Sequence, residues 1–350
     1  MPQRNVSRYL KITVTILLSL ILVGIAAQWF FAHKIKSILK EKVPAELNLT
    51  YGDVSTNVLL GKISLSDVSA NNSEQNIDFK ATSVTVSGLE YIPLLQNGDI
   101  TIGEIRLEAP QVVYHQTEKD TTSKKEKQDP SKTYTVNTFS IQNGTFHMLN
   151  KTADSTATVK GIDFTLSDIK FDKETNQENI PFAFGAYELS TKKGYYSMSA
   201  LEFIQFERMQ LTPDTGGFQQ FVLRTKYSKS ELSRRLQVEH DHYNLNIDDI
   251  SLTDWDFGFE NDLPYFHLGE MQLHKPIFHV YRDKLLPDDT THKKLYNQAL
   301  RDLKMDLQVD SIGISEGLIT YQERLEADVE PEELRFADIG ATISNLHTQG

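Results

Sequence analysis

Cysteine is absent from this chain of 350 residues, and the absence removes several kinds of chemistry. Without a thiol there is no disulfide, no thiolate nucleophile and no zinc or iron–sulfur site built on cysteine. The sequence also lacks a glycine-rich phosphate loop, a GxSxG elbow, an HExxH helix and a DxDxDG calcium loop. We therefore predict that the protein is not an enzyme and has no catalytic residue, metal or cofactor.

An excess of positive charge is also missing. The chain has 36 Lys and Arg against 48 Asp and Glu, a formal net charge of −12. Binding to nucleic acid needs a basic stripe that releases counterions from phosphates, and here the basic residues are scattered among more numerous acidic ones. We expect no nucleic-acid partner.

Long hydrophobic runs are absent except for one. Residues 12–32 read ITVTILLSLILVGIAAQWFFA, 21 residues without a charge, which matches the roughly 20 that a helix needs to cross the hydrocarbon core. We predict a transmembrane helix there, preceded by a cytoplasmic tail at 1–11. The alternative is a cleaved signal peptide with its cleavage site near Gly24–Ala26. Basic residues flank both ends of the run, so the charge bias alone does not decide the orientation.

After the hydrophobic run the pattern changes twice. Residues 33–47 have apolar positions at helical spacing, which predicts a juxtamembrane helix. From residue 48 onward the apolar residues alternate with polar ones, which is typical of half-buried strands. One helix is expected near 290–304, where the apolar residues Leu295, Ala299, Leu300 and Leu303 follow helical spacing. Segment 115–133 has mixed charge and almost no apolar residue, so it should be a solvated loop; contact of its lysines with lipid headgroups is a weaker alternative.

An internal repeat divides the domain into two β units, 48–180 and 181–350. Residues 102–107 (IGEIRL) correspond to 268–273 (LGEMQL), and 136–144 (VNTFSIQNG) correspond to 309–317 (VDSIGISEG). Further echoes link 166–169 to 343–346 and 63–67 to 250–254. The offset between copies drifts, which indicates a repeated unit with insertions at one equivalent connection.

The alternation changes parity inside the repeated block. Ile100 and Ile102 have even numbers, Ile105 and Leu107 have odd ones, and Gly103 lies between them. An uncorrected slip of one residue would turn the apolar set outward, so we predict a bulge or sharp bend at Gly103 and at its counterpart Gly269. Asn143–Gly144 signals either a hairpin or a bend within a long strand.

His240 and His242 are the only candidates for a metal site that the sequence offers. Two histidines that are separated by one residue would project from the same face of a strand. Because no third ligand follows at a recognisable spacing, we interpret them as two solvated histidines.

Several of these segments together resemble a known family. The anchor and basic helix, then YGDVSTNVLLGKISLSDVS, then IxLxxP at Ile105–Pro110 and the closing LRFADIGATISNL are similar to AsmA-like proteins of the bacterial envelope, in particular Bacteroidota-type members. The resemblance implies a single-pass protein of the bacterial inner membrane with a periplasmic domain. It also implies a relation to chorein-type bridge proteins that transfer lipid. Such relatives usually continue with more strands, so we expect the natural protein to continue beyond residue 350.

The expected fold is mainly β: an N-terminal transmembrane helix followed by an elongated, curved, repeat-built antiparallel sheet that forms a groove, with few short helices. The resemblance favours an apolar groove that binds or conducts lipid acyl chains between the inner and outer membranes and supports outer-membrane biogenesis. Its expected lining is Val84, Val86, Ile100, Ile102, Ile105, Leu107, Phe139, Ile141, Ile312 and Ile314. The alternative is a scaffold for outer-membrane protein assembly with a dry β-sandwich. We expect membrane lipid, and in the alternative envelope proteins, as partners.

Overall fold

The computed structural model describes residues 47–57, 60–72, 76–90, 99–116, 130, 132–291 and 296–348. The predicted tail, the transmembrane helix at 12–32 and all but the last residue of the predicted helix at 33–47 lie outside these ranges, as does most of the loop at 115–133. Among the residues that are described, no helix has the length and hydrophobicity required to span a membrane.

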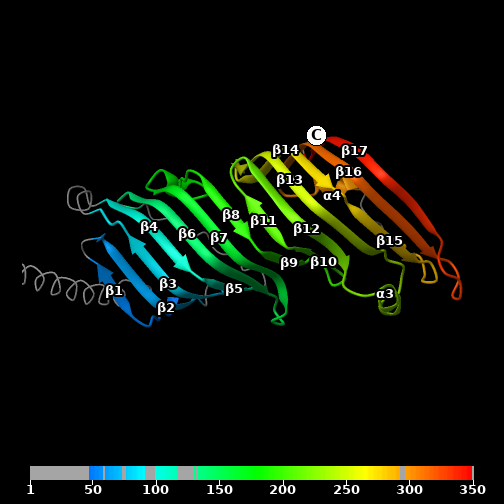
Figure 1. Ribbon diagram of the computed structural model, residues 1–350, viewed down its shortest axis with the longest axis horizontal. Coiled ribbons are helices and arrows are strands. Elements are labelled where there is room, and N and C mark those ends of the chain that lie inside the picture. The colour runs from blue at the N-terminus through cyan, green and yellow to red at the C-terminus, as the bar shows by residue number, and fades with distance from the viewer. Residues whose placement is uncertain are drawn as a thin grey trace, which may run out of the picture.

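Strands dominate the described part of the chain, which confirms the prediction of a mainly β protein (Figure 1). All of them belong to one sheet of 17 strands. The strands are β1 (Val54–Asn57), β2 (Lys62–Asn72), β3 (Ile77–Ser87), β4 (Ile100–Glu108), β5 (Gln111–His115), β6 (Tyr134–Leu149), β7 (Ser155–Phe171), β8 (Tyr187–Thr191), β9 (Lys193–Ser197), β10 (Glu202–Phe206), β11 (Arg208–Leu211), β12 (Thr215–Thr225), β13 (His242–Glu260), β14 (Leu263–His274), β15 (Ile277–Asp283), β16 (Asp306–Arg324) and β17 (Glu333–His347).

The strand pairings run along the sheet almost in chain order. β1 pairs with β2, β2 with β3, and β3 with both β4 and β5. β7 pairs with β8 and β9, which pair in turn with β11 and β10, and these lie against β12. β1 and β17 form the two edges of the described sheet, because each pairs with a strand on one side only. The described sheet is therefore elongated across its strands (Figure 1).

The prediction of a purely antiparallel sheet is wrong at two equivalent places. β6 runs parallel to β4 and β5, and β16 runs parallel to β14 and β15. A parallel pair needs a crossover connection that returns the chain to the starting end of the sheet. The two long connections before β6 and β16 are these crossovers, so the insertions fall at equivalent points as expected. The alternation of side chains reports burial and not the direction of the neighbouring strand, so it could not reveal the parallel pairs.

The repeat is visible in the topology. β3 to β7 and β13 to β17 follow the same sequence of antiparallel and parallel pairings. The echo between 63–67 and 250–254 is wrong as an alignment, because the first segment lies in β2 and the second in β13, whereas β3 is the topological counterpart of β13.

In the described ranges the helices are few and short, as expected. They include η3 (Thr175–Gln177), α3 (Lys229–Arg235) and α4 (Tyr296–Arg301). α4 lies inside the predicted range 290–304. α3 begins with a capping box in which Ser228 and Glu231 bond each other's backbone N–H. Its Lys229 donates a hydrogen bond to Gln322 of β16 at 2.7 Å.

A line of left-handed residues crosses the sheet from β2 to β17, and we call it crease A. The strand register brings these residues, which come from different strands, onto one line. They are Asp67 (φ 48°), Ala109 (46°), Asn143 (54°), Gly161 (61°), Gln220 (51°), Lys275 (52°), Glu316 (55°) and Asp338 (55°). A left-handed residue inside a strand bends it and reverses the alternation of its side chains. Asn143–Gly144 is therefore a bend inside β6 and not a hairpin.

A second line of left-handed residues crosses the sheet alongside crease A, and we call it crease B. The middle of the strands lies between the two creases. Its left-handed members are Gly61 (φ 54°), Gly88 (69°), Asp168 (53°), Asp254 (56°) and Asn345 (56°). The predicted parity slips at Gly103 and Gly269 lie on this line, but neither glycine has a positive φ. Instead, the missing side chain of each glycine lets the neighbouring strand come close. A Cβ on Gly103 would lie 3.3 Å from the Cα of Gly88, and one on Gly269 would lie 2.9 Å from the Cβ of Asp254.

Candidate functional site: the apolar face of the sheet

One face of the sheet carries an unbroken row of apolar residues from edge to edge, which we call the apolar row. Each member pairs directly with the next, and directly paired residues project from the same face of a sheet. The row is Val54, Leu65, Val84, Leu107, Ile141, Phe164, Leu189, Leu211, Gly216, Leu252, Met271, Ile312 and Ile343. Gly216 leaves no gap in the row, because the side chain of Leu211 occupies the space beside it. A Cβ placed on Gly216 would lie 2.6 Å from the Leu211 Cδ2.

The ten predicted groove residues all lie on this face. Val84, Leu107, Ile141 and Ile312 are members of the apolar row itself. The other six occupy neighbouring rows. Val86, Ile105 and Phe139 pair with one another in one row, and Ile314 pairs with Leu273 in a second. Beyond crease B, Ile102 pairs with Val136 and Ile100 pairs with Tyr134. Each of the ten is partly buried. The register therefore brings the predicted residues of each unit together.

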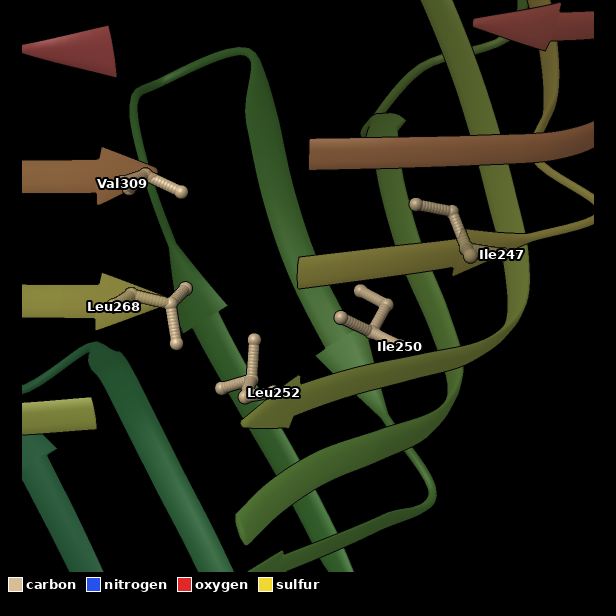
Figure 2. Packing of buried hydrophobic residues seen from close by; sticks show 5 residues of the cluster. All are labelled: Ile247, Ile250, Leu252, Leu268 and Val309. Atoms are coloured by element: carbon tan, nitrogen blue, oxygen red, sulfur yellow. The ribbon is translucent and has the colours of Figure 1, made fainter. Parts of the chain in front are cut away.

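The creases keep the apolar residues on one face in spite of the parity slips. In the second unit Ile247, Ile250, Leu252, Leu268 and Val309 form one buried cluster, although crease A separates the first two and crease B separates Leu252 from Leu268. Figure 2 shows the five side chains directed into the same space, around which β13 curves. Leu268 is only 2% exposed. The bends of the strands therefore bring these five side chains together on one face of the sheet.

The apolar face has a depression on crease A of the second unit. It has a volume of about 190 Å³ and an entirely apolar surface. Residues from five strands, β13 to β17, line it, including Leu245, Ile247, Phe278, Ile314 and Ile319. Ile319 is 39% exposed, so the depression opens outward.

Aromatic rings connect the short strand β8, near the start of the second unit, to β13 and β14. Tyr187 of β8 makes edge contacts with Trp255 and Phe257 of β13, at centroid distances of 6.0 and 6.2 Å. Phe184 contacts Tyr187 at 6.2 Å, and Trp255 contacts Phe266 at 5.7 Å. Aromatic contacts therefore link β8 with the longer strands of the second unit. The sequence analysis did not identify these rings because they fall outside the repeated blocks, although their density after residue 180 was a usable signal.

The opposite face is polar. In β4 the Arg106 guanidinium donates to both carboxylate oxygens of Glu104 at 2.7 and 2.9 Å, and Ser83 donates to Glu108 at 3.1 Å. On crease A the Nζ of Lys275 lies 3.6 Å from Glu316. These side chains face solvent, so the sheet separates an apolar surface from a charged one.

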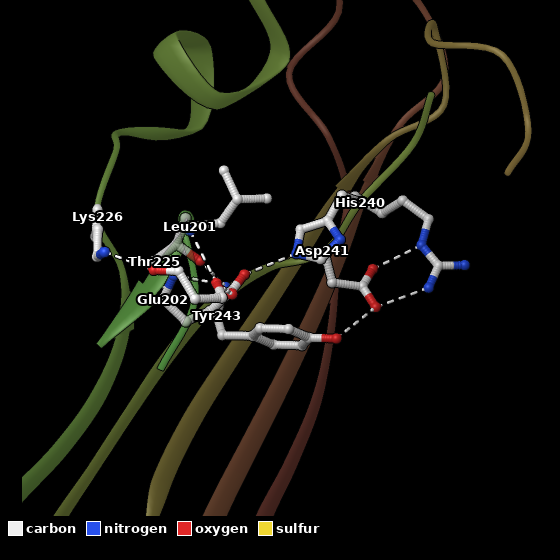
Figure 3. A network of polar contacts seen from close by, with 9 residues as sticks. Leu201, Glu202, Thr225, Lys226, His240, Asp241 and Tyr243 are labelled. Carbon is white, nitrogen blue, oxygen red and sulfur yellow. Dashed lines mark hydrogen bonds and ion pairs between the residues drawn. The ribbon is translucent and has the colours of Figure 1, made fainter. Parts of the chain in front are cut away.

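A polar network closes one end of β13. Arg282 donates two hydrogen bonds to Asp241, at 2.6 and 2.8 Å, and Tyr243 donates a third at 3.2 Å (Figure 3). Burial would raise the pKa of the Asp241 carboxyl, but the hydrogen bonds and charge of Arg282 outweigh it and hold that pKa below its ordinary value of 3.8. The network ties the segment after α3 to β15.

The two histidines considered for a metal have separate partners. His240 bonds Glu202 at 2.7 Å (Figure 3), and His242 bonds the carbonyl oxygen of Tyr227 at 3.0 Å. Burial is the main cause that lowers the pKa of His242. Within the described ranges no group of three or more His, Asp or Glu side chains could hold a metal ion.

Comparison with known proteins adds no identity. No protein-family model matches the chain, and no curated protein matches it. The resemblance to AsmA-like proteins stays a prediction from the sequence.

Proposed function

We propose that this protein binds lipid acyl chains along the apolar face of its sheet. The observation that supports the proposal best is the apolar row, which continues without a polar member across the whole described sheet. A contiguous apolar surface of this length needs an apolar partner, because leaving it in water is unfavourable by about 25 cal/mol for each Å².

The shape of the site also favours a lipid. All strands in the described part of the chain belong to one sheet, so they include no second sheet that could close a dry sandwich. The scaffold alternative therefore has less structural support. An apolar row that crosses the strands suits a chain-like ligand that lies along it, and the polar opposite face suits an aqueous surrounding.

The cellular setting belongs to the same proposal. The apolar run at 12–32 would anchor the protein in the bacterial inner membrane, and the sheet would extend into the periplasm and guide lipid toward the outer membrane. This setting rests on the hydrophobic run and on the resemblance to AsmA-like proteins.

Lipid analysis of the purified protein tests the proposal. The full chain is extracted in detergent, and bound lipids are measured by mass spectrometry for the native protein and for Ile105→Glu. We expect stoichiometric lipid with the native protein and a severalfold loss with Ile105→Glu, because a carboxylate on the apolar face would have to be desolvated against acyl chains.

The matched control is Arg106→Glu, the next residue of β4, which is exposed on the polar face. It should retain the native amount of lipid. A folded native protein with no lipid above background, or equal lipid in the two variants, would contradict the proposal.

A further inference from the structure

The depression on crease A of the second unit adjoins the apolar row, and we call it the crease pocket. Its lining residue Leu273 stands two positions from Met271, a member of the row. Ile314, which also lines it, stands two positions from the row member Ile312. Residues two apart in a strand project from the same face. A hydrocarbon chain that lies on the row can therefore enter the pocket without leaving the apolar face.

A glycine makes room for the pocket at the bend. Gly317 of β16 lines the pocket and contributes no side chain. A Cβ there would lie 3.1 Å from the Cβ of Ile339 and 3.4 Å from the Cγ2 of Ile314, two other lining residues. Gly317 directly follows Glu316, the left-handed member of crease A in β16. The bend and the pocket therefore occur at the same point of the strand.

Polar residues close the pocket on the side away from the row. On the same face, β15 continues from Phe278 in the pocket to Arg282. β16 likewise continues from Ile319 in the pocket to Glu323. Arg282 belongs to the network described above, in which it donates to Asp241 at 2.6 Å. A hydrocarbon chain that continued past these charged groups would remove them from water, which is unfavourable. The pocket therefore suits the end of a chain better than its middle.

The size and lining of the pocket fit the end of a straight hydrocarbon chain. Its volume is about 190 Å³, and its surface is entirely apolar. A cavity of about 150 Å³ lined by leucine, isoleucine and phenylalanine stays dry and binds benzene. The crease pocket therefore has room for about six or seven carbon atoms. A hydroxyl or a charged group inside it would be left without a hydrogen bond.

We propose that the crease pocket holds the methyl end of one acyl chain, while the remainder of that chain lies on the apolar row. The inference rests on the proposed function and adds the orientation and the class of the bound chain. The methyl end lies at crease A of the second unit and the head end points away from it. The preferred ligand is a straight chain without a polar group in its last six or so carbons.

Competition between fatty acids tests the inference. The full chain is delipidated in detergent, and native mass spectrometry measures which acid it binds when less than one equivalent is added. Dodecanoic acid is offered in an equal mixture with 12-hydroxydodecanoic acid, and in a second mixture with 2-hydroxydodecanoic acid. We expect binding of dodecanoic acid to exceed that of the 12-hydroxy acid by about tenfold or more, because the terminal hydroxyl would be buried without a partner. The 2-hydroxy acid, whose hydroxyl stays near the head, should bind like dodecanoic acid.

Variants of Ile319 locate the preference in the pocket. Ile319→Trp fills the opening and should reduce the preference to about twofold or less. Ile319→Phe should have a smaller effect, and the sheet accommodates it because Phe146 has the equivalent position in the first unit. Ile277→Trp is the matched control on the opposite face of the neighbouring strand, at a side chain 37% exposed against 39% for Ile319. It should keep the native preference, and circular dichroism checks that each variant is folded.

Two results would overturn the inference while lipid still co-purifies with the native protein. One is equal binding of dodecanoic acid and its 12-hydroxy derivative, or no binding of either. The other is a preference that both Ile319 variants leave unchanged. Absence of bound acid together with absence of co-purified lipid would instead overturn the proposed function itself.

Discussion

The two units of the sheet have the same topology and the same pair of creases, but they bury their apolar face to different depths. In the second unit Leu268 and Val309 are 2% and 4% exposed, inside a cluster that aromatic residues surround. Their counterparts in the first unit, Ile102 and Val136, are only partly buried. The two units therefore share the path of the backbone and differ in how deeply equivalent side chains are buried.

Under the proposed function, the more open positions of the first unit would leave apolar surface for a ligand, whereas the cluster around Leu268 in the second unit supplies packing that stabilises the sheet. The sharpest test of this division changes equivalent residues in the two units.

The largest effect is expected from truncation at equivalent core positions. Leu268→Ala should lower the free energy of unfolding by about 3 kcal/mol, because it leaves a cavity among buried side chains. Ile102→Ala, its counterpart, should cost about 1–2 kcal/mol, since part of that side chain already contacts solvent. Denaturant unfolding of the delipidated protein measures both values, and equal losses would remove the distinction between the units.

A smaller effect is expected at the end of β13, where the second unit has the partly buried Asp241–Arg282 pair and the first has the exposed pair of His115 and Asp78. Asp241→Asn should cost about 1–3 kcal/mol near neutral pH, because a hydrogen-bonded carboxylate is lost from a partly buried site.

The pH dependence of that cost follows from the lowered pKa of Asp241. A carboxyl whose pKa is lower in the folded state contributes stability above its unfolded pKa of about 3.9 and loses it as pH falls through the folded value. The difference in unfolding free energy between native protein and Asp241→Asn should therefore shrink below about pH 4. A difference that is constant from neutral to acidic pH would contradict the assignment.

The smallest effect concerns crease A, which the units share. Ala109 is left-handed, which costs a non-glycine residue about 1–2 kcal/mol. Ala109→Gly should therefore stabilise the protein by about 0.5–1 kcal/mol, after the greater chain entropy of glycine is subtracted. Lys275 is the counterpart of Ala109 in the second unit. Lys275→Gly should stabilise the protein to a similar extent, because the exposed ion pair with Glu316 that is lost contributes little to stability.

Ala81 provides the control for the crease. It is buried in β3 and has no positive φ, so Ala81→Gly should destabilise the protein by about 1 kcal/mol. Thermal unfolding in one detergent compares the three variants. Destabilisation by Ala109→Gly equal to that of Ala81→Gly would show that the crease carries no backbone strain.

Much of the site followed from the sequence, and the reasons are physical. Strict alternation marked the apolar face, and the slip between Ile102 and Ile105 signalled a bend that restores it. The parallel pairing of β4 and β6 did not follow, because either direction of a neighbour satisfies the same alternation. Crease A as a whole was not predicted, because Ala109 and Lys275 are not residue types that favour a left-handed backbone. The sheet register imposes the left-handed conformation on them.

Site-specific photocrosslinking in bacterial cells tests the central claim most directly. A photoreactive amino acid is placed at Ile105 or Leu107, on the apolar face, and at the adjacent Arg106 or Glu108, on the polar face of the same strand. The account predicts lipid adducts at the first two positions and none at the other two. Lipid adducts at all four positions, or none at Ile105 and Leu107 in the folded protein, would contradict an apolar face that holds acyl chains.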